Sequence, residues 1–225
     1  MCGRYTETKA AEVLKEGFRD CFTDACEDEK LPPRYNVSPG QEAPVILNTD
    51  GTRPLQRVRW GLVPFWATDE KTGYKMINAR AESLREKPAY RKLFEKRRCL
   101  VLADGFYEWK KGGTVKIPHR FVLGQGELFA FAGLWDRWKK PDDSELHTFT
   151  IITTEPNELV RSCHDRMPVI LPRKHYAQWL DPSVTDTERL HPLLRPYPAA
   201  VMRGYPVKSL VNSPRNDTPE CIEAV

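Results

Sequence analysis

The second residue of the chain, Cys2, directly follows the initiator methionine. Because that methionine is usually removed when a small residue follows it, we expect the mature chain to begin with a free α-amine beside a thiol. The ordinary pKa values are about 7.7–8.0 for the amine and about 8.5 for the thiol, so both are partly available as nucleophiles near neutral pH. Such an aminothiol condenses with an aldehyde through its amine, and its thiol then closes a thiazolidine ring on the same carbon. The alternative is that Cys2 is an early residue without a chemical role.

Three other segments combine polar side chains with apolar neighbours. Glu108 lies between two aromatic residues directly after an apolar strand, and His164 lies beside charged residues just before another. The segment around Asn78 adds an amide, a guanidinium and the carboxylate of Glu82. Each has a structural alternative, because ion-pair networks also gather such groups. Glu82 can pair with an arginine, Glu108 can lie on a solvated face, and His164 can be a hydrogen-bonded loop residue.

The elements that must position these residues are mostly short strands. Apolar runs or period-two alternation predict strands at five places: residues 43–47, 100–103, 120–123, 128–131 and 146–152. Gly124, Gln125 and Gly126 lie between two of these runs and predict a hairpin turn.

Fewer helices are expected. The first covers residues 10–18, with Thr8 as its cap and Val13, Leu14 and Phe18 on its buried face. Pro88 opens a second helix through about residue 96 that brings Tyr90 and Phe94 together. A third begins at Pro172, buries Tyr176 and Trp179, and ends at Asp181 and Pro182. Strands outnumber helices without βαβ alternation, so we expect one α+β domain over residues 2–225, with an antiparallel β-barrel-like core and peripheral helices.

Composition excludes several classes of protein. The chain has 225 residues, 40% of them hydrophobic and 29% charged, which is ordinary for a globular domain. No window approaches a membrane span and no apolar region follows Met1, so we expect a cytoplasmic protein. The six cysteines form no Cys-x-x-Cys pair, which argues against zinc, and no cofactor is expected. Cys21 and Cys26 could pair in principle, but reduced thiols are favoured, and Cys99 is expected to be a buried apolar residue.

Together with the N-terminus, these segments resemble one protein family. The motifs are MCGRY at the start, YNVSP at 35–39, WGLVPxW at 60–66, NARAE at 78–82, DGFYEW at 104–109, FAGLW at 131–135 and HDRMP at 164–168. They resemble the SRAP family of SOS response-associated peptidases, or abasic-site processing proteins. The motifs occur in family order and continue to residues 211–217, so the resemblance covers essentially the whole chain.

The resemblance implies a covalent reaction with DNA. Cys2 would attack the ring-opened aldehyde of an abasic site in single-stranded DNA and form a thiazolidine crosslink that shields the lesion. By position, the catalytic asparagine, glutamate and histidine of the family fall on Asn78, Glu108 and His164. Opening the closed sugar requires a general acid and a general base, and His164 exchanges protons near pH 7. Aromatic neighbours can raise the pKa of Glu108, whereas neutral Asn78 would orient the amine or the sugar oxygen.

Arginines in the same motifs are candidates for phosphate contacts: Arg4, Arg80 and Arg166. The formal net charge is only +4, so we expect binding to depend on a local groove rather than on overall basicity. The expected partners are single-stranded DNA with abasic sites and 3′-junction or replication-fork DNA. We further expect a monomer that is associated with the nucleoid at damaged DNA.

Aromatic and small residues supply further candidate DNA contacts. Trp66 and Trp109 are candidates to stack on bases beside the gap, each contact being worth about 1–3 kcal/mol. For Trp66 the alternative is packing in the core. Pro39, Gly40 and Met167 could wedge between stacked bases.

Two other functions remain open from the sequence. Cys2 could be the nucleophile of an N-terminal thiol peptidase that removes Met1 from its own chain, with its own amine as base. The chain could instead bind single-stranded or modified-base DNA without a covalent bond. The crosslinking interpretation is favoured, because an aminothiol suits aldehydes far better than amides. Reversal of the crosslink and DNA lyase activity belong to the same chemistry.

Overall fold

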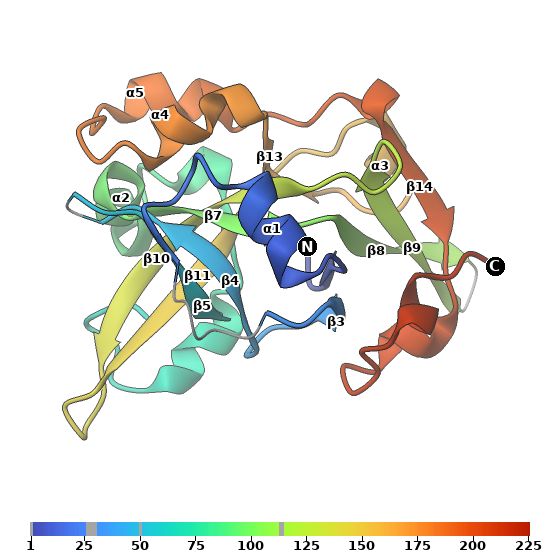
Figure 1. Cartoon of the computed structure of the whole chain (residues 1–225), viewed down its shortest axis with the longest axis horizontal. Coiled ribbons are helices and arrows are strands. Elements are labelled where there is room, and N and C mark those ends of the chain that lie inside the picture. The colour runs from blue at the N-terminus through green and yellow to red at the C-terminus, as the bar shows by residue number, and fades with distance from the viewer. Residues whose placement is uncertain (1, 26–30, 50, 113–114) are drawn as a thin grey trace.

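Two apolar runs become strands that are buried along most of their length (Figure 1): β7 (Arg98–Ala103) and β10 (Phe129–Lys139). Alternate residues of β7 point to opposite sides, so Leu100 and Leu102 contribute to one apolar cluster. Cys99 and Val101 contribute to a second cluster on the other side. The central strands therefore separate two cores. The computed structural model describes residues 2–25, 31–49, 51–112 and 115–225.

The strands form two sheets. The smaller sheet is antiparallel and has the order β14 (Met202–Pro206), β9 (Val115–Leu123), β8 (Gly105–Gly112), β1 (Tyr5–Glu7) and β3 (Arg34–Val37). The larger sheet contains β7 and β10 together with β2 (Asp24–Ala25), β4 (Glu42–Leu47), β5 (Pro54–Trp60), β6 (Asn78–Arg80), β11 (Glu145–Thr154), β12 (Met167–Pro168) and β13 (Ile170–Leu171).

One pairing closes the larger sheet into a barrel. β5 pairs with β4 in antiparallel fashion and with β11 in parallel, where Arg59 and Trp60 lie opposite Thr148 and Phe149. Because β11, β10, β7 and β4 are joined in turn, the ring closes through β5. The expected α+β class with a barrel-like core is confirmed. The expected antiparallel arrangement is incomplete, since β2 with β5 and β6 with β11 are also parallel pairs.

Short helices lie around the two sheets, with α3 beside β14 of the smaller sheet (Figure 1): α1 (Ala11–Gly17), α2 (Pro88–Lys96), α3 (Glu158–Arg161), α4 (Tyr176–Leu180) and α5 (Thr187–Leu190). Pro88 occupies the first turn of α2, where its missing N–H costs nothing, and Tyr90 and Phe94 are buried. A 3₁₀ turn at Arg173–His175 leads into α4, which buries Tyr176 and Trp179 as expected.

Three local expectations are wrong. The N-cap of α1 is Ala10, because the hydroxyl and the backbone N–H of Thr8 both donate to Asp104. Val13 is 49% exposed, whereas Leu14 and Phe18 are buried. Gly124 and Gly126 do form a turn with positive φ, but the strands on either side of it enter different sheets, so no hairpin results.

The chain after β14 folds back over the smaller sheet (Figure 1). Its 3₁₀ turns are Ser209–Asn212 and Pro219–Ile222, and we call residues 207–225 the C-terminal segment. Val207, Val211 and Cys221 are buried in a small third cluster with Tyr107 of β8. The outer face of the smaller sheet is therefore covered by the end of the chain.

Two further expectations concern the class of protein and its thiols. None of the helices in the described part of the chain is long and apolar enough to cross a membrane. Cys99 is fully buried, as expected, and Cys21 carries a free thiol. Cys26 lies outside the described residues.

Candidate active site

Strand pairing brings Cys2 alongside Glu108. Tyr5 lies opposite Phe106 in the antiparallel pair of β1 and β8, and the N–H of Tyr107 donates to Arg4 O at 3.0 Å. The same register continues toward the N-terminus and places Cys2 beside the stretch of β8 that carries Glu108. Both residues are buried: Cys2 is completely buried, and Glu108 is 3% exposed. The two catalytic candidates that are 106 residues apart in sequence thus share one buried site.

Burial controls the protonation of both groups. It raises the pKa of the Cys2 thiol far above its ordinary value, and the negative charge of Glu108 raises it further. Burial also raises the pKa of Glu108 to about 7. The thiol is therefore neutral at pH 7, while Glu108 is divided between its two forms. A carboxylate in this state can take a proton from a neighbour and return it.

Asn78 joins the N-terminal residue to the larger sheet. It begins β6, which pairs in parallel with β11 at Ile151. Its Nδ2 donates to the backbone oxygen of Cys2 at 2.8 Å, and its buried Oδ1 has no hydrogen-bond partner among the described residues. The amide therefore fixes the Cys2 backbone and still offers an acceptor to an amine or a hydroxyl.

His164 follows α3 and has two competing contacts at Nδ1. The N–H of Arg166 donates to Nδ1 at 3.0 Å, and Asp165 Oδ1 lies 2.8 Å from the same atom. The first contact requires a neutral ring and the second a protonated one. Burial lowers the pKa of His164, with Asp165 opposing this effect, so the neutral form dominates at pH 7. With Nδ1 as acceptor, the proton of the neutral ring is on Nε2.

Arg166 is held by a carboxylate. Its two terminal nitrogens donate to the two oxygens of Glu82 at 2.8 and 2.9 Å, and Nη2 also donates to Thr153 O at 2.6 Å. These hydrogen bonds lower the pKa of Glu82. The structural alternative for Glu82, pairing with an arginine, is confirmed. Arg80 ends β6 one residue before the following 3₁₀ turn and is exposed.

The expected DNA contacts differ in where their side chains lie. Trp66 is 57% exposed, so it is not a core residue, and its neighbour Phe65 is 66% exposed. Gly40 has a φ of +87° and approaches the exposed ring of Tyr74. Sequence reasoning missed Phe65 and Tyr74, although an aromatic residue beside Trp66 in a proline-containing loop was a usable signal.

Met167 and Pro39 complete the set of wedge candidates. Met167 is fully buried, and its sulfur accepts a hydrogen bond from the N–H of Asn157 at 3.3 Å. A side chain in the core cannot reach stacked bases without leaving its packing. Pro39 is partly exposed in the turn after Ser38, next to Gly40. Of the three wedge candidates, only Pro39 and Gly40 lie at the surface.

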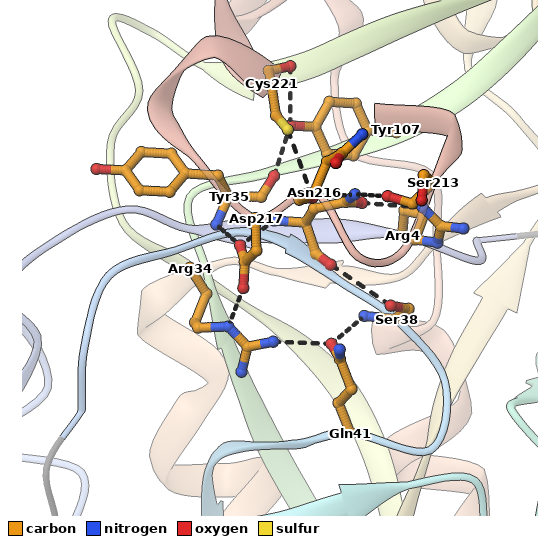
Figure 2. Close-up of polar contacts among 11 residues, drawn as sticks. Arg4, Arg34, Tyr35, Ser38, Gln41, Tyr107, Ser213, Asn216, Asp217 and Cys221 are labelled. Carbon is orange, nitrogen blue, oxygen red and sulfur yellow. Dashed lines mark hydrogen bonds and ion pairs between the residues drawn. The ribbon is translucent and has the colours of Figure 1, made fainter. Parts of the chain in front are cut away.

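Arg4 and Trp109 contact the C-terminal segment. Arg4 Nη1 donates to Asn36 Oδ1 at 3.0 Å and to Val211 O at 2.7 Å. Trp109 Nε1 donates to Asn212 Oδ1 at 2.7 Å, and the Arg4 guanidinium lies 6.0 Å from the Trp109 ring centre. Figure 2 shows Arg4 beside Ser213 and Asn216 of the C-terminal segment. The two side chains thus lie together on the side of β8 opposite Glu108.

Within the described ranges, no group of three or more histidine, cysteine, aspartate or glutamate side chains could hold a metal ion. The candidate site residues offer a thiol, a carboxyl group whose pKa is raised to about 7, an amide and an imidazole.

Comparison with known proteins shows the family of the chain. The family model described as SOS response associated peptidase (SRAP) matches residues 1–214. The chain belongs to the SRAP family. The abasic site processing protein YoqW of Bacillus subtilis is 49% identical over 230 residues, covering 100% of both chains. Abasic site processing protein HMCES of Xenopus tropicalis is 32% identical over 266 residues, covering 100% of this chain and 78% of its own.

The fold of this chain also occurs in solved structures. A crystal structure of a protein from Bacteroides thetaiotaomicron superimposes with a TM-score of 0.87 at 30% identity, covering 100% of both chains. A second, from Bordetella bronchiseptica, has a TM-score of 0.77 at 28% identity, covering 92% of this chain and 100% of its own. The fold of this chain, with its barrel and smaller sheet, is thus shared with these two proteins.

Proposed function

We propose that this SRAP protein processes abasic sites in DNA by forming a covalent thiazolidine crosslink through Cys2, after removal of Met1. The observation that carries the proposal is the burial of Cys2 beside Glu108, a carboxyl group whose pKa is raised to about 7. The names of its relatives as abasic site processing proteins support the substrate class. Residues 2–225 act as one domain in this proposal.

The first step is opening of the sugar. An abasic sugar is mostly a closed hemiacetal, so the C1 hydroxyl must lose a proton while the ring oxygen gains one. Glu108 in its ionised form accepts the hydroxyl proton. Glu108 then returns this proton to the ring oxygen, while neutral His164, with its proton on Nε2, donates a hydrogen bond to that oxygen. The products are an aldehyde and a hydroxyl group, and Glu108 is again ionised.

The second step joins protein and DNA. The amine of Cys2 attacks the aldehyde, water leaves and an imine forms. The sulfur then bonds to the same carbon, and the thiol proton is transferred to the imine nitrogen by way of Glu108. Asn78 Oδ1 is available to accept a hydrogen bond from the attacking amine and so to orient its lone pair. Because the thiol is neutral at pH 7, a nearby proton acceptor is required for this closure.

The DNA groove in this proposal is local. Arg80 and Arg166 contact phosphates beside the catalytic groups, and Trp66 stacks on an exposed base. Arg4 and Trp109, expected from the sequence to contact DNA, are instead held by the C-terminal segment on the side of β8 opposite Glu108. Pro39 and Gly40 approach the flanking nucleotides. The partner is single-stranded, 3′-junction or fork DNA, bound by a monomer in the cytoplasm at the nucleoid.

Intact-mass measurement with an oligonucleotide that contains one abasic site tests the proposal. The expected result is loss of Met1 and a denaturant-resistant mass increase equal to the whole oligonucleotide minus water. An oligonucleotide with the natural base at that position is the control and should give no adduct. The family description as a peptidase favours a second activity, removal of Met1 by the chain itself. A purely peptidase or purely non-covalent function predicts no adduct with either oligonucleotide, and that result would refute crosslinking.

A further inference from the structure

The C-terminal segment is fastened to the smaller sheet by a network of polar contacts (Figure 2). Asn36 Nδ2 donates to three backbone oxygens of the segment, those of Val211, Ser213 and Asn216, at 3.2, 2.9 and 2.6 Å. Asn36 itself is fully buried in β3. One side chain of the sheet therefore organises six residues of the segment.

Asp217 makes the reverse connection. Its Oδ1 accepts from the N–H groups of Tyr35 and Asn36 at 2.5 and 2.8 Å, and its Oδ2 pairs with Arg34 Nε. Hydrogen bonds to a charged acceptor are among the stronger ones in proteins. The edge strand β3 is thus held by a carboxylate from the far end of the sequence.

These contacts end on the neighbours of the reactive residues. Arg4, two residues after Cys2, is bonded to both Asn36 and the segment. Trp109, next to Glu108, donates to Asn212, and Tyr107 on the other side of Glu108 donates through its hydroxyl to Tyr35 O at 2.7 Å. The backbones that carry Cys2 and Glu108 are therefore fixed from the face opposite the site.

We propose that the C-terminal segment is a positioning element for the crosslinking reaction, with Asp217 as its anchor and Asn212 as its contact to β8. This inference rests on the proposed function and assigns no chemical step to the segment. Asp217 acts through β3 and Arg4 on the placement of Cys2, and Asn212 acts through Trp109 on β8. Loss of the anchor lowers the rate of crosslinking within the bound complex and leaves the affinity for the oligonucleotide unchanged.

The test measures two quantities for each variant. One is the crosslinking rate at saturating abasic oligonucleotide, and the other is the dissociation constant for the same oligonucleotide with an unreactive tetrahydrofuran site. Asp217→Ala should slow the saturated rate by about 10- to 100-fold, because small misplacements of reacting groups are costly. Its dissociation constant should stay within about threefold of the wild-type value. An unfolded variant would not bind the oligonucleotide with such a constant, so this measurement separates misplaced reacting groups from loss of the fold.

Three more variants complete the experiment. Asp217→Asn keeps an oxygen acceptor for the two backbone N–H groups and should recover most of the rate. Asn212→Ala alters an exposed residue, should fold even if Asp217→Ala does not, and should also slow the saturated rate. Glu223→Ala is the matched control, because its ion pair with Lys208 lies within the segment and contacts neither Arg4 nor Trp109. It should react at the wild-type rate.

Each outcome decides between the proposals. A wild-type rate for Asp217→Ala and Asn212→Ala would overturn the positioning role and leave the proposed function intact. An equal loss for Asp217→Asn and Asp217→Ala would overturn the assignment of the anchor. No adduct with the wild-type protein would refute the proposed function and this inference together.

Discussion

Glu108 and Cys2 affect each other through charge as well as through chemistry. Ionised Glu108 opposes formation of a thiolate at Cys2, so the pair holds a neutral thiol beside a carboxyl group that titrates near pH 7. This arrangement suits a reaction in which the amine acts first and the thiol gives up its proton only during ring closure. Two predictions follow from the chemistry of these residues.

Replacing Glu108 should change the pH dependence of crosslinking. The folded pKa of about 7 means that the ionised, proton-accepting form of Glu108 increases as pH rises through 7. The wild-type rate should therefore rise with an inflection near pH 7. Glu108→Gln should be slower by about 10²–10⁴-fold and lack that inflection. Single-turnover rates between pH 5 and 9 measure both effects, and identical profiles for the two proteins would exclude Glu108 as the base.

Cys2→Ala separates the two nucleophiles, provided that Met1 is removed. The α-amine remains and should still form an imine with the abasic aldehyde. Without sulfur the imine persists, acidifies the neighbouring sugar carbon and permits β-elimination of the 3′ phosphate. We expect little stable crosslink, an adduct trapped by borohydride and some strand cleavage on denaturing gels. Binding without a trapped adduct or cleavage would show that the thiol attacks first.

At the scale of elements, β1 carries an unusual carboxyl group. Both oxygens of Glu7 are buried without a hydrogen-bond partner among the described residues, and burial raises its pKa well above its ordinary value. Nearby Asp104 adds to this effect, while Arg34 and Arg57 oppose it. Glu7 therefore favours folding in its protonated form, and its contribution is complete below the unfolded pKa of about 4.5.

The contribution of Glu7 should be lost as pH rises from about 4.5 toward its folded pKa, by at most about 1.4 kcal/mol per pH unit. Urea unfolding at several pH values should show a smaller decline of the unfolding free energy for Glu7→Gln than for the wild type. The comparison concerns slopes, since a buried amide has its own cost. Glu42→Gln is the control, because Glu42 is an exposed residue near the same strands. Parallel slopes for Glu7→Gln and wild type would contradict the assignment.

Local sequence signals predicted the elements that depend on local physics. Pro88 and the spacing of Tyr90 and Phe94 predicted α2 with its observed bounds, because helix start and buried face are both local. The turn at Gly124 was recognisable, but its strands part because β9 pairs with β8 and β14, whereas β10 pairs with β7 and β11. The parallel pairing that closes the barrel joins residues about ninety positions apart, and no local pattern encodes it.

The same distinction holds for the candidate site. Motifs identified Cys2, Asn78, Glu108 and His164, and the structure brings Asn78 and Glu108 to Cys2. Burial of Met167 was not predictable, because the alternation that buries it is set by pairing of β12 with β11. Contacts of the C-terminal segment with Arg4 were missed because they depend on chain reversal over the whole sheet.

At the scale of the whole molecule, the modest net charge of +4 makes DNA affinity a local property. Arg80→Ala should weaken binding to all abasic oligonucleotides and reduce the slope of log affinity against log salt by about one. Arg91→Ala, an exposed arginine of α2, is the matched control and should bind as the wild type does. Fluorescence anisotropy with the tetrahydrofuran oligonucleotide at several salt concentrations measures both. Equal slopes for the three proteins would place the groove elsewhere.

The burial of Cys2 sets an order of events during synthesis. β1 gains its partner β8 only after about half of the chain has been made, and Asp217 fastens β3 near the end. Until then the N-terminus is accessible to a methionine aminopeptidase, and afterwards Cys2 is enclosed. Removal of Met1 by an aminopeptidase would therefore have to precede folding, whereas removal by the chain itself would require the folded site. Refolding of a full-length, unprocessed chain separates the two routes, because it would leave Met1 in place under the first and remove it under the second.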